Sequence, residues 1–220
     1  MIDIKKWVEE YLIRAKDLFG ERLVFVGLQG SYGRGEATEN SDIDVVLILD
    51  EVKPGDLSEY GKMLDTLAHR SKVCGFVSGI EELKRWEPHD LFQFYHDTEQ
   101  IFGSIEFMKE LIKDEDVRRA VRIGACNIYH MCVHNMVHEK DVNILKSLYK
   151  AAVFSVQAVS YLQTGVYRKS KRELIKFLQE PERKILETGN EIKEKNGFQR
   201  EEFERLSGEL LRWASGLIRG

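Results

Sequence analysis

The stretch from Leu28 to Asp50 constrains this chain more than any other. It reads LQGSYGRGEATENSDIDVVLILD and joins a glycine-rich turn to an apolar run. Ten residues separate Ser31 from Asp42, and one apolar residue separates Asp42 from Asp44. The run Val45–Leu49 is short, apolar and rich in β-branched residues, so it predicts a buried strand with two carboxylates at its entrance.

The two carboxylates at the start of this strand are candidates for a metal site. Successive side chains of a strand point to opposite faces, so we expect Asp42 and Asp44 on one face and Ile43 on the other. Carboxylates held side by side repel each other unless a cation lies between them. Their oxygen ligands suit Mg²⁺ or Mn²⁺. We therefore predict that Asp42 and Asp44 bind a divalent metal ion and are the catalytic carboxylates.

The glycine-rich turn before the carboxylates is a candidate phosphate site. A strand over 23–28 (LVFVGL) would place Gly30 and Ser31 at its end, where a short helix begins. Gly30 has no Cβ, which lets a ligand approach the backbone closely. Backbone N–H groups and the Ser31 hydroxyl can hold a phosphate there, and Arg34 can add a further contact. Gly30, Ser31 and Arg34 are therefore the predicted nucleotide-binding residues.

This combination of motifs resembles the nucleotidyltransferase superfamily related to DNA polymerase beta. The resemblance rests on Gly30-Ser31, on Asp42-Ile43-Asp44 and on the strand that follows. Within the superfamily, the sequence GSYGRGEA…SDIDVVL is most similar to those of the minimal and aminoglycoside-type nucleotidyltransferases. Either motif alone would be weak evidence, but the two at this spacing between two expected strands are specific. A glycine-rich hairpin with an acidic, solvated strand entrance is the purely structural alternative.

The resemblance implies an enzyme that depends on Mg²⁺ or Mn²⁺. It would transfer a nucleoside monophosphate, by expectation AMP, from an NTP such as ATP to a hydroxyl group of an acceptor and release pyrophosphate. The acceptor would be a small molecule, a protein side chain or an RNA end. Because the net charge is −4, we expect no binding of extended nucleic acid.

The third strand departs from the family pattern. Most active members carry a third carboxylate there, which acts as the base for the attacking hydroxyl or completes the metal site. The corresponding stretch 72–78 (KVCGFVS) has no acid, and Cys74 or Phe76 takes the position. The acids close in sequence, none of them singled out by spacing, are Glu81, Glu82, Asp90, Asp97 and Glu99. The alternative function is therefore a catalytically weak or inactive NTP-binding or regulatory protein, such as an antitoxin-like partner of another chain.

Periodicity divides the chain into two parts. Strand and helix signals mix up to Gly103, and helical periodicity continues from there to the end. The expected fold class is α+β, with a small mixed-sheet nucleotidyltransferase domain over 1–103 and an all-α helical bundle over 104–220. The second part resembles, more weakly, the substrate-side domains of aminoglycoside-type enzymes. We expect the acceptor between the two parts, because ligand sites favour domain interfaces.

The expected elements follow from periodicity and from breaks at glycine and proline. Strands are expected over 23–28, 45–49, 72–78 and 100–102. Helices are expected over 4–19, 57–70, 81–86, 114–138, 142–163, 171–179, 182–195 and 200–219.

Cysteine content and hydropathy set the expected environment. The 3 cysteines are too few and too scattered for a disulfide framework or a cysteine-based zinc site. The N-terminus is charged and amphipathic, unlike a signal peptide, and no apolar run is long enough to cross a membrane. The cytoplasm is therefore the expected location, and a homodimer or a partner protein remains open.

Two further sets of residues have alternative interpretations. One expected helix carries Cys126, His130, His134 and His138 at intervals of four residues. Histidines at this spacing can bind a transition metal, but an interior or pocket-lining role is favoured. The lysines that flank the following helices are Lys146, Lys150, Lys169 and Lys171. Exposed helix charges are the favoured interpretation for these lysines, and contacts with phosphates are the alternative.

Overall fold

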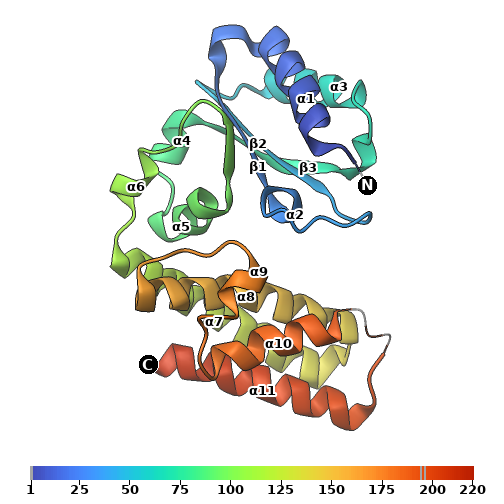
Figure 1. The fold of residues 1–220 in the computed structure, drawn as a ribbon, viewed down its shortest axis with the longest axis vertical. Coiled ribbons are helices and arrows are strands. Elements are labelled where there is room, and N and C mark those ends of the chain that lie inside the picture. The colour runs from blue at the N-terminus through green and yellow to red at the C-terminus, as the bar shows by residue number, and fades with distance from the viewer. Residues whose placement is uncertain (1, 194, 196) are drawn as a thin grey trace. The chain divides into compact units, whose positions relative to one another are not determined.

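The chain divides into two compact units, 1–112 and 113–220, each with its own hydrophobic core (Figure 1). The structure is a computed structural model and describes residues 2–193, 195 and 197–220. The first unit combines a sheet with helices and the second is helical, so the predicted α+β class is confirmed. The first unit extends past Gly103 because Ile105 and Met108 are fully buried in its core.

A mixed sheet of four strands, in the order β3-β2-β1-β4, forms the centre of the first unit. Strand β1 (Leu23–Gln29) pairs antiparallel with β2 (Ile43–Leu49) and with β4 (Glu99–Phe102). Strand β3 (Val73–Gly79) pairs with β2 in parallel. The parallel pair requires a crossover, which helix α3 (Pro54–Asp65) provides. The sheet therefore brings the start of β2 beside the end of β1 and the start of β3.

Helices cover the sheet on both faces (Figure 1). Helices α1 (Ile4–Phe19) and α3 pack on one face against Ile43, Val45 and Leu47. Val46 and Ile48 point to the opposite face, which is covered by three short helices. These are α4 (Ile80–Lys84), α5 (Pro88–Asp97) and α6 (Met108–Leu111). Because side chains alternate along β2, the side chain of Asp44 belongs to the face of α4, α5 and α6.

Capping residues explain where the helices of the first face begin and end. The Asp3 carboxylate accepts a hydrogen bond from the Lys6 N–H at the start of α1, and Gly20 ends the helix as predicted. Helix α3 begins at Pro54, earlier than predicted, because proline suits the first turn and the Asp56 carboxylate caps the Lys53 N–H at 2.8 Å. It also ends earlier than predicted, at Asp65.

The second unit is a helical bundle. Residues buried between its helices include Ile128, Tyr149, Leu186 and Leu210. A π-helical turn, Asn135–Glu139, extends the first long helix close to its predicted end. The elements are α7 (Asp114–His134), α8 (Val142–Thr164), α9 (Lys171–Leu174), α10 (Glu182–Ile192) and α11 (Arg200–Arg219).

Two predictions for this unit involve residues that lie outside the described part of the chain. The helix predicted over 182–195 passes through Glu194, and the break predicted after it begins at Asn196. Among the described residues, no helix is both long and apolar enough to span a bilayer.

Candidate active site

The turn after β1 and the second carboxylate are in direct contact. Gln29, the last residue of β1, pairs with Asp44 of β2, and the short helix α2 (Gly30–Gly33) begins at the next residue. Gly30 has φ +64°, and a Cβ on this residue would overlap the carboxylate of Asp44. Both the backbone conformation and the close approach therefore require glycine here. The structure brings together two motifs that the sequence predicts as one site.

The two carboxylates differ in their surroundings. Asp44 is half-buried inside β2, whereas Asp42 is exposed and lies just before the strand. Ile43, between them, is fully buried on the opposite face. Two carboxylates in this position form a donor set of hard oxygen atoms, which fits Mg²⁺ better than a transition metal.

The protein supplies only part of a coordination sphere. In the described part of the chain, no group of three or more His, Cys, Asp or Glu side chains is arranged to hold a metal ion. Asp42 and Asp44 nevertheless fit a nucleotide-bound Mg²⁺, since this ion commonly takes one or two carboxylates and completes its shell with phosphates and water.

Backbone hydrogen bonds close the turn that carries Ser31. The Arg34 N–H donates to the Gly30 carbonyl at 3.1 Å, and the Glu36 N–H donates to the Ser31 carbonyl at 2.8 Å. Ser31 is half-buried. Helix α2 has only 4 residues, so its macrodipole is small and a phosphate would depend on individual N–H groups.

Strand pairing identifies the neighbour of Asp44 on the third strand. Cys74 pairs directly with Asp44 in the parallel ladder, and Phe76 pairs with Val46. Directly paired residues of adjacent strands share a face, so the exposed Cys74 thiol stands next to Asp44. Of the two residues proposed for the missing acid, Cys74 therefore has the matching register.

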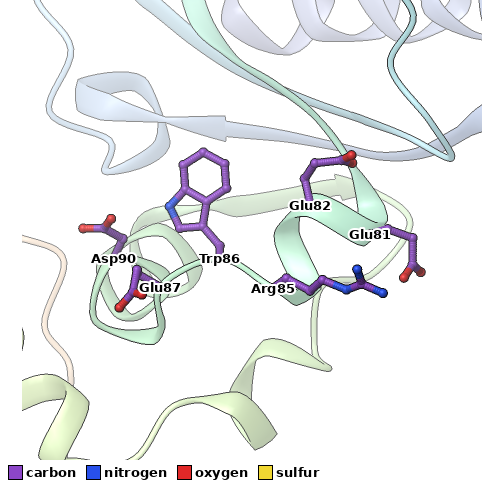
Figure 2. Close-up of a pocket in the computed structure, with 6 residues that line it drawn as sticks. All are labelled: Glu81, Glu82, Arg85, Trp86, Glu87 and Asp90. Carbon is purple, nitrogen blue, oxygen red and sulfur yellow. The ribbon is translucent and has the colours of Figure 1, made fainter.

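Three of the five acids considered as a base lie on α4 and in the first turn of α5. Glu81, Glu82 and Asp90 line a hollow of about 650 Å³ around Trp86, as Figure 2 shows. Helix α4 begins only after Gly79, and the strand from Cys74 to Gly79 spans about 17 Å. This distance separates Glu81 and Glu82 from Cys74, whereas the Trp86 ring packs against Phe76 of β3.

The other two acids lie near the Gly30 end of the sheet, but neither stands next to Asp44 in a strand ladder. Glu99 pairs with Leu28, whose side chain belongs to the face of α1 and α3, opposite to that of Asp44. Asp97 is buried and forms an ion pair with Arg34.

Arg34 is held by two acids. Its Nη1 lies 3.5 Å from Asp97 Oδ2, and its Nε lies 3.7 Å from Glu36 Oε2. The side chain of Arg34 is 15% exposed and that of Asp97 only 7% exposed. Arg34, which we predict to contact the phosphates, is therefore held in place by the protein itself.

Gln29 and Thr98 connect the end of α5 to the site, and sequence reasoning missed both. The Gln29 side chain donates a hydrogen bond to Thr98 Oγ1 at 2.7 Å. Gln29 pairs with Asp44, so its side chain lies on the same face as that carboxylate. A polar residue at the end of the apolar strand, directly before Gly30, was the one available signal for Gln29. No local pattern marked Thr98.

The histidine stripe does not form part of the bundle interior. Cys126, His130 and His138 are exposed and His134 is half-buried. The expectation of an interior role is wrong for the three exposed residues. Helix α7 turns a neighbouring face to the core, formed by Val117, Val121, Ala125, Ile128 and Cys132.

The bundle lysines are mostly engaged locally or exposed. Lys146 donates to the main-chain carbonyls of Lys193 and Lys195, near the end of α10. Lys150 is exposed, and Lys169 and Lys171 are half-buried in the segment that leads into α9.

Comparisons with known proteins define the class of this chain. A family model described as a nucleotidyltransferase domain matches residues 8–116. A relative from Methanocaldococcus jannaschii, "Putative protein adenylyltransferase MJ1379", is 35% identical over 73 residues, which are 33% of this chain and 68% of that protein. The chain therefore belongs to the nucleotidyltransferase family.

A solved structure agrees in fold over almost the whole chain. The spectinomycin adenyltransferase AAD(9) from Enterococcus faecialis, solved with ATP and spectinomycin, matches with a TM-score of 0.58 and 12% identity. The alignment covers 98% of this chain and 99% of that chain. At this identity the likeness concerns the fold alone, an α+β domain followed by a helical region.

Proposed function

We propose that this protein transfers AMP from ATP to a hydroxyl group of an acceptor and releases pyrophosphate. Family membership supports nucleotidyl transfer, and the name of the M. jannaschii relative supports ATP as the donor. The observation that carries the proposal is the contact between the Gly30 turn and the Asp44 carboxylate. It joins a phosphate-binding backbone to a metal-binding side chain within one site.

Asp42 and Asp44 would hold Mg²⁺ or Mn²⁺ together with the phosphates of the nucleotide. When bound, the ion neutralises phosphate charge and favours in-line displacement at the α-phosphorus. Gly30 and Ser31 would donate hydrogen bonds to the β- and γ-phosphates, and Arg34 would pair with them. These residues hold the leaving pyrophosphate while the α-phosphorus stays open to the acceptor.

The transfer itself exchanges one phosphorus–oxygen bond for another. The acceptor oxygen bonds to the α-phosphorus as the bond from this phosphorus to the bridging oxygen breaks. Pyrophosphate leaves with the electron pair of the broken bond, and the hydroxyl proton passes to solvent. Cys74 beside Asp44 provides no carboxylate base for this proton, so we expect slow turnover or an acceptor that ionises readily.

The register of Cys74 also favours a second candidate function. Without a third carboxylate, the same site would bind ATP and Mg²⁺ and serve regulation, for instance within a complex with a partner protein. In this second function the protein would make the same contacts with ATP as in the first, but it would not transfer AMP to an acceptor.

A transfer assay separates the two functions. The protein would be incubated with ATP labelled at the α-phosphate and with Mg²⁺, in the presence of small hydroxyl compounds, proteins or RNA ends. We expect pyrophosphate release and label on one acceptor class, both lost in Asp44→Asn. The control Asp50→Asn changes a carboxylate at the other end of β2 and should keep activity. Binding of ATP without pyrophosphate release from any acceptor class would favour the regulatory function.

A further inference from the structure

The ion pair between Arg34 and Asp97 joins residues 63 positions apart in the sequence. Asp97 is the last residue of α5, and its neighbour Thr98 accepts the hydrogen bond from Gln29. Gln29 pairs with Asp44 across β1 and β2. The end of α5 therefore lies on the face of the sheet that carries the Asp44 carboxylate.

We propose that Asp97 is a positioning residue that holds the Arg34 guanidinium ready for the β- and γ-phosphates of ATP. The inference rests on the proposed function and adds a residue to its site. A carboxylate buried as deeply as Asp97 needs a charged or hydrogen-bonding partner. Arg34 provides this partner, and in return its long side chain is restricted to one region of the site.

The contact geometry leaves Arg34 able to bind an anion as well. Asp97 approaches Nη1 and Glu36 approaches Nε, while a guanidinium carries five N–H donors in a planar fork. Arg34 also follows directly on α2, and its N–H is bonded to the Gly30 carbonyl. The main chain of Arg34 is therefore part of the phosphate turn, and its guanidinium is held from the other side by Asp97.

Anchoring lowers the entropic cost of binding. A free arginine side chain loses rotamer freedom when it grips a phosphate. At Arg34 this loss has already occurred in folding, because Asp97 and the short turn fix both ends of the side chain. Removing the Asp97 charge should therefore weaken the triphosphate contact without altering Asp42, Asp44 or Gly30.

The test compares ATP with AMP by calorimetric titration in Mg²⁺. We expect Asp97→Asn to weaken ATP binding about tenfold, the usual scale for a hydrogen bond to a charged group, and to leave AMP binding unchanged. A structural role would instead lower the melting temperature and change both affinities alike or neither. In the Arg34→Gln background, Asp97→Asn should add less than about a twofold effect, since the two changes remove one contact.

The chain offers a matched control at a distance from the site. Asp56 pairs with Arg22 at 2.8 Å in the same unit, so Asp56→Asn breaks a comparable ion pair and should bind ATP as wild type does. If Asp97→Asn does not fold, Asp97→Glu keeps the charge and moves the carboxylate by one methylene group. Asp97→Glu should also weaken the binding of ATP and leave the binding of AMP unchanged.

The outcomes distinguish failure of the inference from failure of the proposed function. Wild-type affinity for ATP in the folded Asp97 variants, with loss of binding in Asp44→Asn, would overturn the positioning role and leave the function standing. Absence of Mg²⁺-dependent ATP binding in the wild type would overturn both.

Discussion

Strand β2 has carboxylates at both ends, and the two ends are built differently. After its last residue, Arg22 binds Asp50 at 3.1 Å and also Asp56 of α3 at 2.8 Å. At its start, Asp44 lies against the glycine turn at Gly30 and beside Cys74. Arg22 pairs with both acids at the first end, whereas the Gly30 backbone lies against Asp44 at the second. We infer from this difference that the Arg22 ion pairs stabilise the fold, and we propose that Asp44 is placed to meet a ligand.

The largest effect is expected from Gly30→Ala, which would fill the space beside Asp44. The methyl group both overlaps the carboxylate and strains a backbone with φ +64°. We expect a loss of about 2 kcal/mol or more in the free energy of unfolding and loss of ATP binding, measured by urea denaturation and calorimetry.

Gly20→Ala is the control for the backbone strain alone. Gly20 has φ +56°, but a Cβ added there would meet no atom within 4 Å, so its replacement should destabilise the fold and keep ATP binding. Tight ATP binding by Gly30→Ala would show that the contact between the turn and Asp44 is not part of the site.

A smaller effect is expected from Cys74→Asp, which would restore an acid beside Asp44. Cys74 is exposed, so the change should leave the core intact, and repulsion by Asp44 should lower the melting temperature less in Mg²⁺ than without it. We expect pyrophosphate release to rise about tenfold or more, because a base in this position can accept the proton of the acceptor. Cys74→Ser is the control and should remain at the wild-type rate. An equal rate in all three proteins would mean that the missing carboxylate is not what limits transfer.

The smallest effect is expected at the other end of β2. Hydrogen bonds from the Arg22 side chain, and then from the Lys53 N–H, lower the pKa of the Asp56 carboxyl to about 2. A carboxyl with a lowered pKa stabilises the fold above its ordinary pKa, near 4, and loses that contribution as the pH falls toward 2. Thermal unfolding of wild type and Asp56→Asn should differ slightly at neutral pH and converge near pH 2. A constant difference over this range would contradict the assignment.

Local sequence was sufficient for the start of β2. Gly30 and Asp44 lie within one short stretch, so strand alternation and turn chemistry alone predict their contact. The missing acid of the third strand was also visible, and only the strand register was needed to choose Cys74 over Phe76.

Long-range contacts explain what the sequence could not provide. The pairing of Arg34 with Asp97 depends on how α5 packs on the sheet, which no local pattern encodes. Helix α6 is short and lies after Gly103, the predicted end of the first domain, although it packs in the core of the first unit. The exposure of the histidine stripe depends on which face of α7 the other bundle helices cover. In each of these cases tertiary packing, and not the local sequence, determines the structure.

Calorimetric titration of the protein with ATP, with and without Mg²⁺, tests the metal and nucleotide site most directly. We expect Mg²⁺-dependent binding by the wild type and by Asp50→Asn, and loss of that binding in Asp42→Asn and Asp44→Asn. Equal binding by all four proteins, or binding that ignores Mg²⁺, would contradict the assignment of the two carboxylates at the start of β2.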